Sequence, residues 1–188
     1  VSGGVTVSTY TTSSGAGQVR VRWGSHTKTF AATLGIVSGT HVLYVTRSNV
    51  SYVFDTSTGH VTKIGSLRAA AYDIAGSYVA YAKKDGTVWR RKIGSSKAVK
   101  LRGATTGVQF IDVIASGDYV GWIVQRSSGN SSGYRNARTM AKPVNLPSTY
   151  TLQRLTTNGA LVARATGALT LSWYVRKYAS TAYVKVLS

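Results

Sequence analysis

The fold is indicated most clearly by residues 74–89, which read IAGSYVAYAKKDGTVW. In this stretch a glycine turn leads into an apolar segment, and the pair Asp85-Gly86 follows it. Asp-Gly favours a tight hairpin, because glycine tolerates the positive φ that such a turn requires. A second alternating segment begins at Thr87. The stretch therefore predicts two short antiparallel strands joined by a hairpin.

The same pattern of a small residue, a glycine and an alternating apolar segment occurs five times along the chain. Its glycines are Gly3, Gly39, Gly76, Gly117 and Gly159, separated by steps of 36, 37, 41 and 42 residues. A near-constant period of about 40 residues indicates a repeat built from a few strands. Four short strands with turns between them match the size of one β-propeller blade.

We therefore predict an all-β fold, a β-propeller with about five blades of short antiparallel strands, as a single domain over residues 1–188. The alternative is a β-sandwich, which does not require glycines at a fixed period. The first repeat lacks the strand that should precede its glycine, so about nineteen strands are expected where five blades need about twenty. Either this blade is incomplete or residues upstream of Val1 are missing, and a fragment of a larger propeller is the competing interpretation.

The fourth repeat is the most difficult to divide into strands. Its second strand is expected over residues 138–141 and its third over residues 149–154. Residues 127–133, which read SSGNSSG, are expected to form the longest flexible loop. Flexible loops on rigid scaffolds often carry recognition.

Residues 74–81, followed by residues 85–89, resemble the blades of bacterial extracytoplasmic propellers of the TolB-like kind. The resemblance covers most of the chain and rests on the blade pattern. It implies protein and ligand binding rather than a shared reaction. The Trp-Asp and Gly-His dipeptides of eukaryotic propeller repeats do not recur here, and no repeated sugar-binding motif is present.

The charge of the chain is far from balanced. Lys and Arg total 23, the acids are five aspartates, and the formal net charge is +18. Such a charge attracts polyanions. The candidates are nucleic acid, anionic cell-wall polymers, acidic lipid surfaces and an acidic partner protein. A cationic surface without a specific ligand is the alternative.

The residues that usually carry catalysis or bind metals are scarce. The chain has no cysteine, so disulfides and thiolate ligands are excluded. Its three histidines form no metal-binding spacing, and no Ser-His-Asp order that would mark a nucleophile is evident. Asp73 and Asp112, which precede glycine turns, are candidates for a central channel, but the aspartates do not form an expected catalytic pair. We predict no catalytic residue, no cofactor and no metal site.

The third repeat combines basic and aromatic residues, a composition that binds phosphates and stacks on bases or sugars. Alternation places some of these side chains on each face of the blade. Inter-blade packing is the other explanation for the aromatic residues, since Trp173 recurs near the repeat position of Trp89. The candidate binding residues are Lys83, Lys84, Arg90, Arg91, Lys92, Tyr78, Tyr81 and Trp89.

Together these features predict a non-enzymatic secreted binding module, a protein-docking adaptor in an extracellular assembly. The first alternative is a lectin-like propeller that binds cell-surface glycans or anionic polymers, and the second is a hydrolase. Nucleic acid is a possible partner through charge alone. Export is expected from the abundance of Ser, Thr, Gly and Tyr and from a start at Val1 without an apolar leader. The sequence contains no run of 18 apolar residues, so we predict no transmembrane segment.

Overall fold

The computed structural model describes residues 4–165 and 170–187. Within these ranges the chain forms nineteen strands and no helix, and hence no helix able to cross a membrane. Contacts divide the chain into two compact units. Unit 1 comprises Val1–Arg68, Asp73–Val79 and Arg91–Ala98, and unit 2 comprises Ala69–Tyr72, Ala80–Arg90 and Val99–Ser188. The single domain over residues 1–188 stays a prediction.

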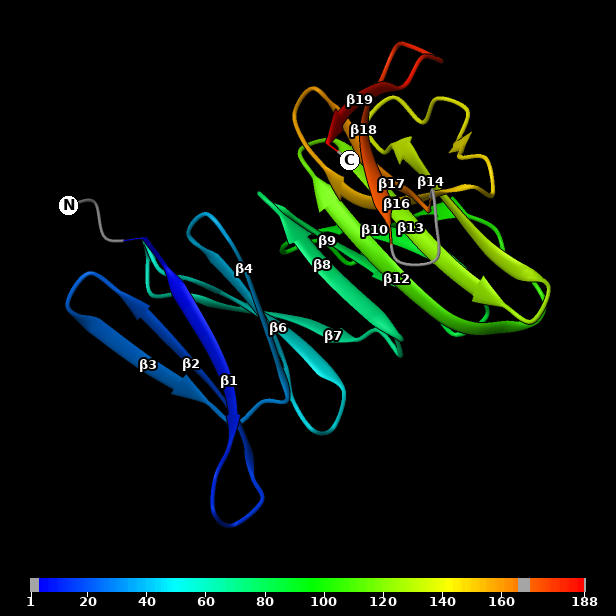
Figure 1. Cartoon of the computed structure of the whole chain (residues 1–188). Coiled ribbons are helices and arrows are strands. Elements are labelled where there is room, and N and C mark those ends of the chain that lie inside the picture. The colour runs from blue at the N-terminus through cyan, green and yellow to red at the C-terminus, as the bar shows by residue number, and fades with distance from the viewer. Residues whose placement is uncertain (1–3, 166–169, 188) are drawn as a thin grey trace. The chain divides into compact units, whose positions relative to one another are not determined.

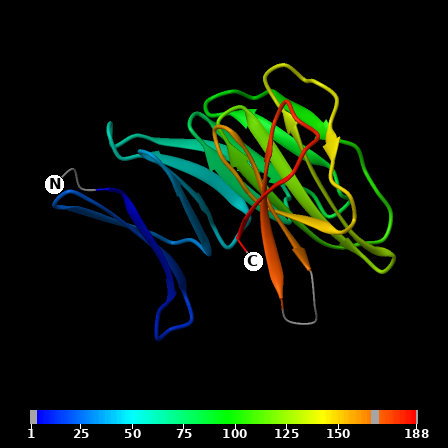
Figure 2. The same ribbon diagram turned by 45° about the horizontal axis from the view of Figure 1, so that its top comes forward.

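The strands form five separate antiparallel sheets, each made of strands that follow one another in the chain (Figures 1 and 2). The first sheet has three strands: β1 (Thr6–Thr11), β2 (Gly17–Trp23) and β3 (His26–Phe30). The second has four: β4 (Leu34–Ser38), β5 (His41–Val45), β6 (Val50–Asp55) and β7 (Val61–Ser66). The third consists of β8 (Ala71–Ala75), β9 (Tyr78–Ala82), β10 (Val88–Lys92) and β11 (Ala98–Arg102).

The last two sheets lie in unit 2 and have four strands each. The fourth sheet consists of β12 (Val108–Ser116), β13 (Tyr119–Arg126), β14 (Gly129–Asn136) and the short β15 (Val144–Asn145). The fifth consists of β16 (Tyr150–Leu155), β17 (Gly159–Ala165), β18 (Leu171–Lys177) and β19 (Val184–Leu187). Five separate sheets are the arrangement expected for propeller blades, whereas a sandwich would place the strands in two.

The glycine turns explain the repeat. Gly39, Gly76 and Gly117 have φ values of 58°, 52° and 53°, and each lies between the first and second strand of its sheet. A residue with a Cβ pays a steric cost in this left-handed conformation, so glycine recurs there. Gly3 lies outside the described residues.

Gly159 does not belong to this series. It is the first residue of β17, and its φ lies outside the left-handed region. A Cβ on Gly159 would lie 2.5 Å from the backbone oxygen of Arg176 on β18. This glycine is therefore required by the close approach of two strands rather than by a turn.

Three strand assignments in the fourth repeat were wrong. Residues 127–133 are not a loop: β14 begins at Gly129 and pairs with β13 along its full length. Its Ser-Gly sequence does not reveal that Ser132, Gly133 and Tyr134 are all buried in the sheet. Residues 138–141 follow β14 outside any strand, and residues 149–154 overlap β16, the first strand of the fifth sheet.

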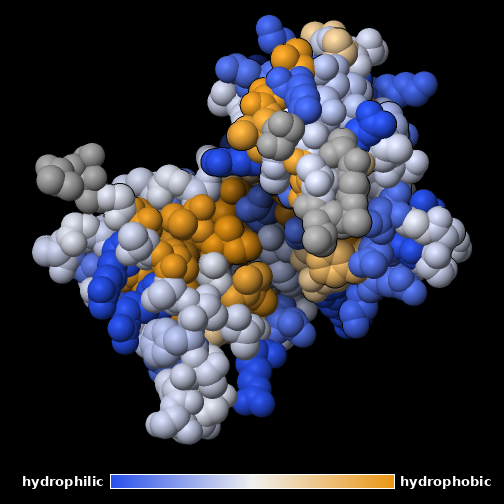
Figure 3. Space-filling view, in the orientation of Figure 1, coloured by the Kyte–Doolittle hydropathy of each residue, from blue (hydrophilic) through white to orange (hydrophobic). Residues whose placement is uncertain are grey.

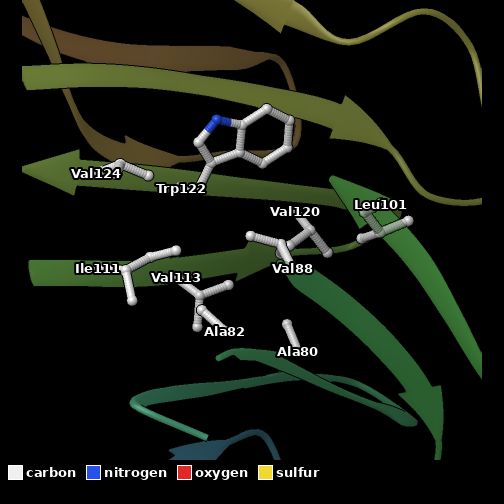
Figure 4. Packing of buried hydrophobic residues seen from close by; sticks show 9 residues of the cluster. All are labelled: Ala80, Ala82, Val88, Leu101, Ile111, Val113, Val120, Trp122 and Val124. Atoms are coloured by element: carbon white, nitrogen blue, oxygen red, sulfur yellow. The ribbon is translucent and has the colours of Figure 1, made fainter. Parts of the chain in front are cut away.

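The core is built from small aliphatic side chains at alternate strand positions. In unit 2 one cluster joins side chains of the third and fourth sheets around Trp122 (Figure 4). Its members are Ala80, Ala82, Val88, Leu101, Ile111, Val113, Val120, Trp122 and Val124. In unit 1 Val19, Val21, Val42 and Phe54 form a cluster between the first two sheets. Burial of such side chains contributes about 1.5–3 kcal/mol each.

Candidate binding surface

The hairpin between β9 and β10 carries the centre of the candidate surface. The Lys83 N–H donates to the Thr87 carbonyl oxygen at 2.9 Å, and the Gly86 N–H donates to the Lys83 carbonyl oxygen at 2.9 Å. Gly86 has a φ of 82°. The turn that Asp85-Gly86 predicts is therefore formed, and it places Lys83 and Lys84 at the end of the hairpin.

The indole of Trp89 is held by a short chain of hydrogen bonds. Its Nε1 donates to Thr87 Oγ1 at 2.9 Å, and Thr87 Oγ1 donates to Asp85 Oδ1 at 2.7 Å. The Thr87 N–H also donates to Asp85 Oδ1, at 2.9 Å. These bonds from Thr87, first the hydroxyl and then the amide, lower the pKa of Asp85. The chain of bonds fixes the plane of the Trp89 ring.

Two lysines lie against this ring. Lys83 Nζ is 5.1 Å and Lys100 Nζ is 5.2 Å from its centroid, both within the range of a cation–π interaction. The ring of Tyr81 runs nearly parallel to the indole, with an interplanar angle of 8° and centroids 6.4 Å apart. We call Lys83, Trp89 and Lys100 the Trp89 surface; Tyr81, which is 5% exposed, is buried next to it. All four residues belong to unit 2.

A small pocket lies next to Lys84, the chain neighbour of Lys83. It has a volume of about 240 Å³ and is lined by Ala70, Lys84, Val108, Gln109, Phe110 and Ile111, all in unit 2. Phe110 is 54% exposed, and the pairing of β12 with β13 shifts register between Val108 and Phe110. A β-bulge of this kind redirects side chains. The pocket, called the Phe110 pocket below, offers apolar walls and one ammonium group.

Arg90 does not face the surface. It is 6% exposed, and its Nη2 lies 3.5 Å from Asp118 Oδ1 and 3.5 Å from the Gly117 carbonyl oxygen. Asp118 also lies 3.8 Å from Arg138 Nη1. A buried guanidinium that meets a carboxylate and a turn carbonyl joins β10 to the β12–β13 turn. Arg90 therefore belongs to the interior of unit 2 and not to the binding surface.

The remaining candidates belong to unit 1. The Arg91 guanidinium donates to the carbonyl oxygens of Ser95 and Ile64, the second at 2.7 Å. Lys92 is exposed at the end of β10, and Tyr78 is half-buried at the start of β9. The structure therefore brings together Lys83, Tyr81 and Trp89, and Lys84 lines the pocket. Arg90 is internal, and Arg91, Lys92 and Tyr78 belong to unit 1.

Several residues of the surface were missing from the sequence-based candidates. Lys100 reaches Trp89 from β11, a contact that depends on strand pairing and that sequence spacing alone does not show. Phe110 is 54% exposed and lies at the register shift in the pairing of β12 with β13, which the sequence did not reveal. The Asp85–Thr87–Trp89 chain had a signal in the sequence, since Asp-x-Thr-x-Trp after a tight turn places all three side chains on one face.

Asp85 lies within electrostatic reach of this surface, since Lys83 and Lys100 contribute, after the hydrogen bonds from Thr87, to its lowered pKa. Three other aspartates have partners elsewhere. Asp55 accepts from the N–H and hydroxyl of Ser57, which lowers its pKa, and it lies 4.0 Å from His41 Nε2. Asp73 and Asp112 each accept the N–H of the next residue at 2.8 Å. Over the described residues, no group of three His, Cys, Asp or Glu side chains gathers as a metal site would require.

Comparison with known proteins gives information on the fold of the chain. No family model matches the chain, and no curated protein matches it. Among solved structures it is similar to the acylaminoacyl peptidase of Pyrococcus horikoshii, with a TM-score of 0.64 and 9% identity over 97% of this chain. It is also similar to a prolyl endopeptidase, with a TM-score of 0.63 and 15% identity over 92% of this chain. The chain has a β-propeller fold.

A third similar structure is Prp20p from Saccharomyces cerevisiae, with a TM-score of 0.59 and 8% identity over 97% of this chain. The chain spans 37% of the acylaminoacyl peptidase, 33% of the prolyl endopeptidase and 61% of Prp20p. At these identities the likeness concerns the propeller fold alone. The more specific TolB-like resemblance stays a prediction.

Proposed function

We propose that this chain is a non-enzymatic, secreted binding module that docks a partner protein in an extracellular assembly. The partner segment is acidic and carries at least one bulky apolar side chain. Its carboxylates bind at Lys83 and Lys100 of the Trp89 surface, and its apolar side chain enters the Phe110 pocket. Secretion is part of the proposal and rests on the composition of the chain.

The observation that carries this proposal is that two consecutive residues of one hairpin in unit 2 belong to the Trp89 surface and to the Phe110 pocket. Lys83 lies over Trp89, while the next residue, Lys84, lines the Phe110 pocket. A polymer that binds by charge alone makes no contact that requires an apolar pocket or an ordered tryptophan. Aromatic side chains that are both rigid and amphipathic are enriched in protein interfaces.

Protein binding also agrees with what a similar propeller does. Prp20p from Saccharomyces cerevisiae is described by its binding to Gsp1p and histones, and it shares the fold of this chain. One fold hosts many functions, so this likeness supports a binding role in general. The acidic character of the partner follows instead from the +18 net charge of this chain.

The test uses a peptide that combines a run of glutamates with one phenylalanine. The double variant Lys83→Gln/Lys100→Gln should bind it up to about tenfold more weakly, because each exposed ion pair between a lysine and a glutamate is worth about 0.2–1 kcal/mol. Phe110→Ala should weaken binding by a similar factor through loss of the pocket wall. Binding is measured by isothermal titration calorimetry.

The matched control is Lys177→Gln/Lys185→Gln, which removes the same charge from exposed positions of the fifth sheet in unit 2. Its affinity for the peptide should stay within about twofold of the unaltered chain. Equal losses in the two double variants would mean that only total charge matters, and the Trp89 surface would then lose its role.

A second candidate function is the binding of an anionic glycan or other anionic polymer. The arrangement of two lysines around one half-buried indole favours it, because aromatic rings stack on sugars while ammonium groups bind anionic substituents. It differs from protein docking in the part played by Phe110. A heparin fragment should lose affinity in Lys83→Gln/Lys100→Gln and keep it in Phe110→Ala.

A further inference from the structure

Two arginines of unit 2 lie on either side of one valine. Arg102 is the last residue of β11, and Arg126 is the last residue of β13. A Cβ built on Gly86 would lie 3.0 Å from Arg102 Nη1 and 3.2 Å from Val108 Cγ2, so both groups border the same point of the β9–β10 hairpin. Arg126 is the direct cross-strand partner of Val108, and side chains opposite each other in an antiparallel pair share one face of the sheet. Both arginines therefore flank Val108.

The two guanidinium groups interact electrostatically. Burial lowers the pKa of Arg102, and the positive charge of Arg126 lowers it further. Arg102 is held in this position, because its Nη1 donates to the carbonyl oxygens of Gly86, at 2.5 Å, and of Gly103, at 3.3 Å. Two like charges at close range destabilise each other's charged form, and an anion between them removes this repulsion.

The aspartates of unit 2 are engaged elsewhere. Asp85 accepts hydrogen bonds from Thr87, and Asp112 accepts the N–H of the next residue. Asp118 lies beside Arg90. Within the described ranges no carboxylate forms an ion pair with either of the two guanidinium groups. Their charges are therefore not balanced by a neighbouring acid.

The Arg126 guanidinium also contains a buried donor without an acceptor. Its Nε is buried and forms no hydrogen bond within the described residues. Such groups are rare in native structures, and an ion that accepts their proton is one explanation. The next residue, Ser127, is exposed, and Figure 3 shows a mostly hydrophilic surface where Figure 1 draws the turn between β13 and β14. A small anion can therefore approach this end of β13 from solvent.

A third cation, Lys84, borders the same place, since Lys84 and Val108 both line the Phe110 pocket. One carboxylate would balance only one of three charges. A phosphate monoester carries about −1.5 to −2 charges at pH 7 and offers three strong acceptor oxygens. Guanidinium groups also match phosphate geometrically, because one fork donates two parallel N–H bonds. The cluster therefore suits a phosphate group better than a carboxylate.

We infer that Arg102 and Arg126 form a binding site for a phosphate group, either the free ion or the monoester of a larger molecule. Its oxygens accept hydrogen bonds from both guanidinium groups, including Arg126 Nε, and Lys84 adds a third positive charge at the border. A monoester places its organic substituent along Val108 in the Phe110 pocket. The site is distinct from the Trp89 surface and does not depend on the docking of an acidic segment.

The test titrates the whole chain with inorganic phosphate, phenyl phosphate or acetate at constant ionic strength and about pH 7. In NMR spectra the Arg126 Nε–H signal and the Val108 amide signal should shift and saturate with both phosphates and not with acetate. Phe110→Ala distinguishes the two sources: loss of affinity for phenyl phosphate alone assigns the site to a monoester, and unchanged affinity for both ligands assigns it to the free ion. Saturation by acetate at the same concentration, or no shift with either phosphate, would overturn the inference.

Variants at Arg126 locate the site. Arg126→Gln should lower the affinity for phosphate at least about tenfold, because charge-assisted hydrogen bonds are lost. Arg126→Lys keeps the charge and loses the planar fork, so it should also bind more weakly than the unaltered chain. The matched control, Arg154→Gln, removes one charge from an exposed position of β16 in unit 2 and should stay within about twofold. Equal losses in Arg126→Gln and Arg154→Gln would mean that phosphate follows net charge alone, and the assigned site would be wrong.

Thermal unfolding gives an independent measurement on the same variants. A ligand that binds the folded chain raises its Tm. Phosphate should therefore raise the Tm of the unaltered chain and of Arg154→Gln, and it should raise that of Arg126→Gln much less. Without phosphate, Arg126→Gln should be at least as stable as the unaltered chain, because the repulsion of Arg102 is gone. A rise in Tm that is equal in all three chains would contradict the site.

Discussion

At the scale of single residues, the orientation of Trp89 depends on Thr87 and Asp85. The indole N–H donates to the Thr87 hydroxyl, which in turn donates to the Asp85 carboxylate. Thr87 is buried at 3% exposure, so water does not replace these bonds easily. The orientation of the proposed binding surface is thus set by a buried side chain behind it.

Thr87→Val removes the hydroxyl and keeps the shape of the side chain. The buried indole N–H then lacks its acceptor, and we expect a loss of about 1–3 kcal/mol in the free energy of unfolding. Urea denaturation followed by tryptophan fluorescence measures it. Thr29→Val, at an exposed position on β3, is the control and should change stability by less than about 0.5 kcal/mol. Equal effects of the two variants would contradict the hydrogen-bond chain.

Asp85 also predicts a pH dependence. Hydrogen bonds from Thr87 lower the pKa of Asp85 in the folded chain. A carboxylate whose folded pKa lies below its unfolded value of about 3.9 stabilises the fold above that pH and loses this contribution as the pH falls through the folded pKa. Asp85→Asn lacks this contribution. The difference in unfolding free energy between the two chains should therefore shrink as the pH falls below about 3.9. A difference that stays constant with pH would contradict the lowered pKa of Asp85.

Part of the residue-level picture was available from the sequence. Lys83, Tyr81 and Trp89 were recognised because basic and aromatic residues alternate around a predicted hairpin. Arg90 was taken as a surface residue, but period-2 alternation places it on the opposite face from Trp89, beside Asp118. Lys100 was missed because its contact with Trp89 depends on how β10 and β11 pair.

At the scale of strands and turns, three recurrent glycines close the turn between the first and second strands of the second, third and fourth sheets. Gly117 has a φ of 53°, and no atom lies within 4 Å of a Cβ built on it. Its requirement for glycine is therefore one of backbone conformation and not of space. Gly103 offers the contrast, since it has equally open surroundings and no left-handed φ.

Gly117→Ala should destabilise the chain by about 1–2 kcal/mol, the cost of a left-handed residue that carries a Cβ. Gly117→Asn should cost less, because asparagine tolerates this conformation. Gly103→Ala, the control, should be neutral or stabilising by up to about 1 kcal/mol. Thermal unfolding compares the three variants, and equal destabilisation by alanine at both glycines would disprove the assigned turn.

Ser132 links two sheets of unit 2 through hydrogen bonds of its hydroxyl. Its hydroxyl donates to the Tyr150 carbonyl oxygen at 3.2 Å and accepts the Leu152 N–H at 3.2 Å, so β14 is joined to β16. Ser132→Ala leaves both backbone groups without this partner, and we expect a loss of about 1–3 kcal/mol in unfolding free energy. Ser128→Ala in the adjacent exposed turn should have little effect. The expectation fails if amide exchange at Leu152 is equally slow in both variants.

β14 also shows why some elements were not predictable. Its polar sequence, GNSSGYRN, lacks the β-branched residues that mark strands, so it was assigned to a loop. Its strand conformation depends on pairing with β13 along eight residues, an interaction between parts of the chain rather than a local preference. By contrast β9, with the sequence YVAYA, and the turn after it follow from local sequence alone.

At the scale of the whole molecule, the glycine period predicted the number of sheets, and the absence of a strand before the first glycine predicted which sheet has three strands. The net charge of +18 was also known from the sequence, because five aspartates cannot balance 23 Lys and Arg residues in any fold. The sequence does not show which of the lysines lie next to apolar side chains. Those contacts depend on the register shift at Phe110 and on the pairing of β11 with β10, which the structure provides.

The central claim is that the Trp89 surface and the Phe110 pocket bind an acidic segment with an apolar anchor. The most direct test measures the affinity of the chain for the glutamate-rich peptide, with and without its phenylalanine, between about 50 mM and about 200 mM salt. We predict that the phenylalanine raises affinity about tenfold or more at both salt concentrations, because its burial does not depend on counterions. If the two peptides bind equally and both lose affinity steeply with salt, the chain binds polyanions by charge alone and the docking account is wrong.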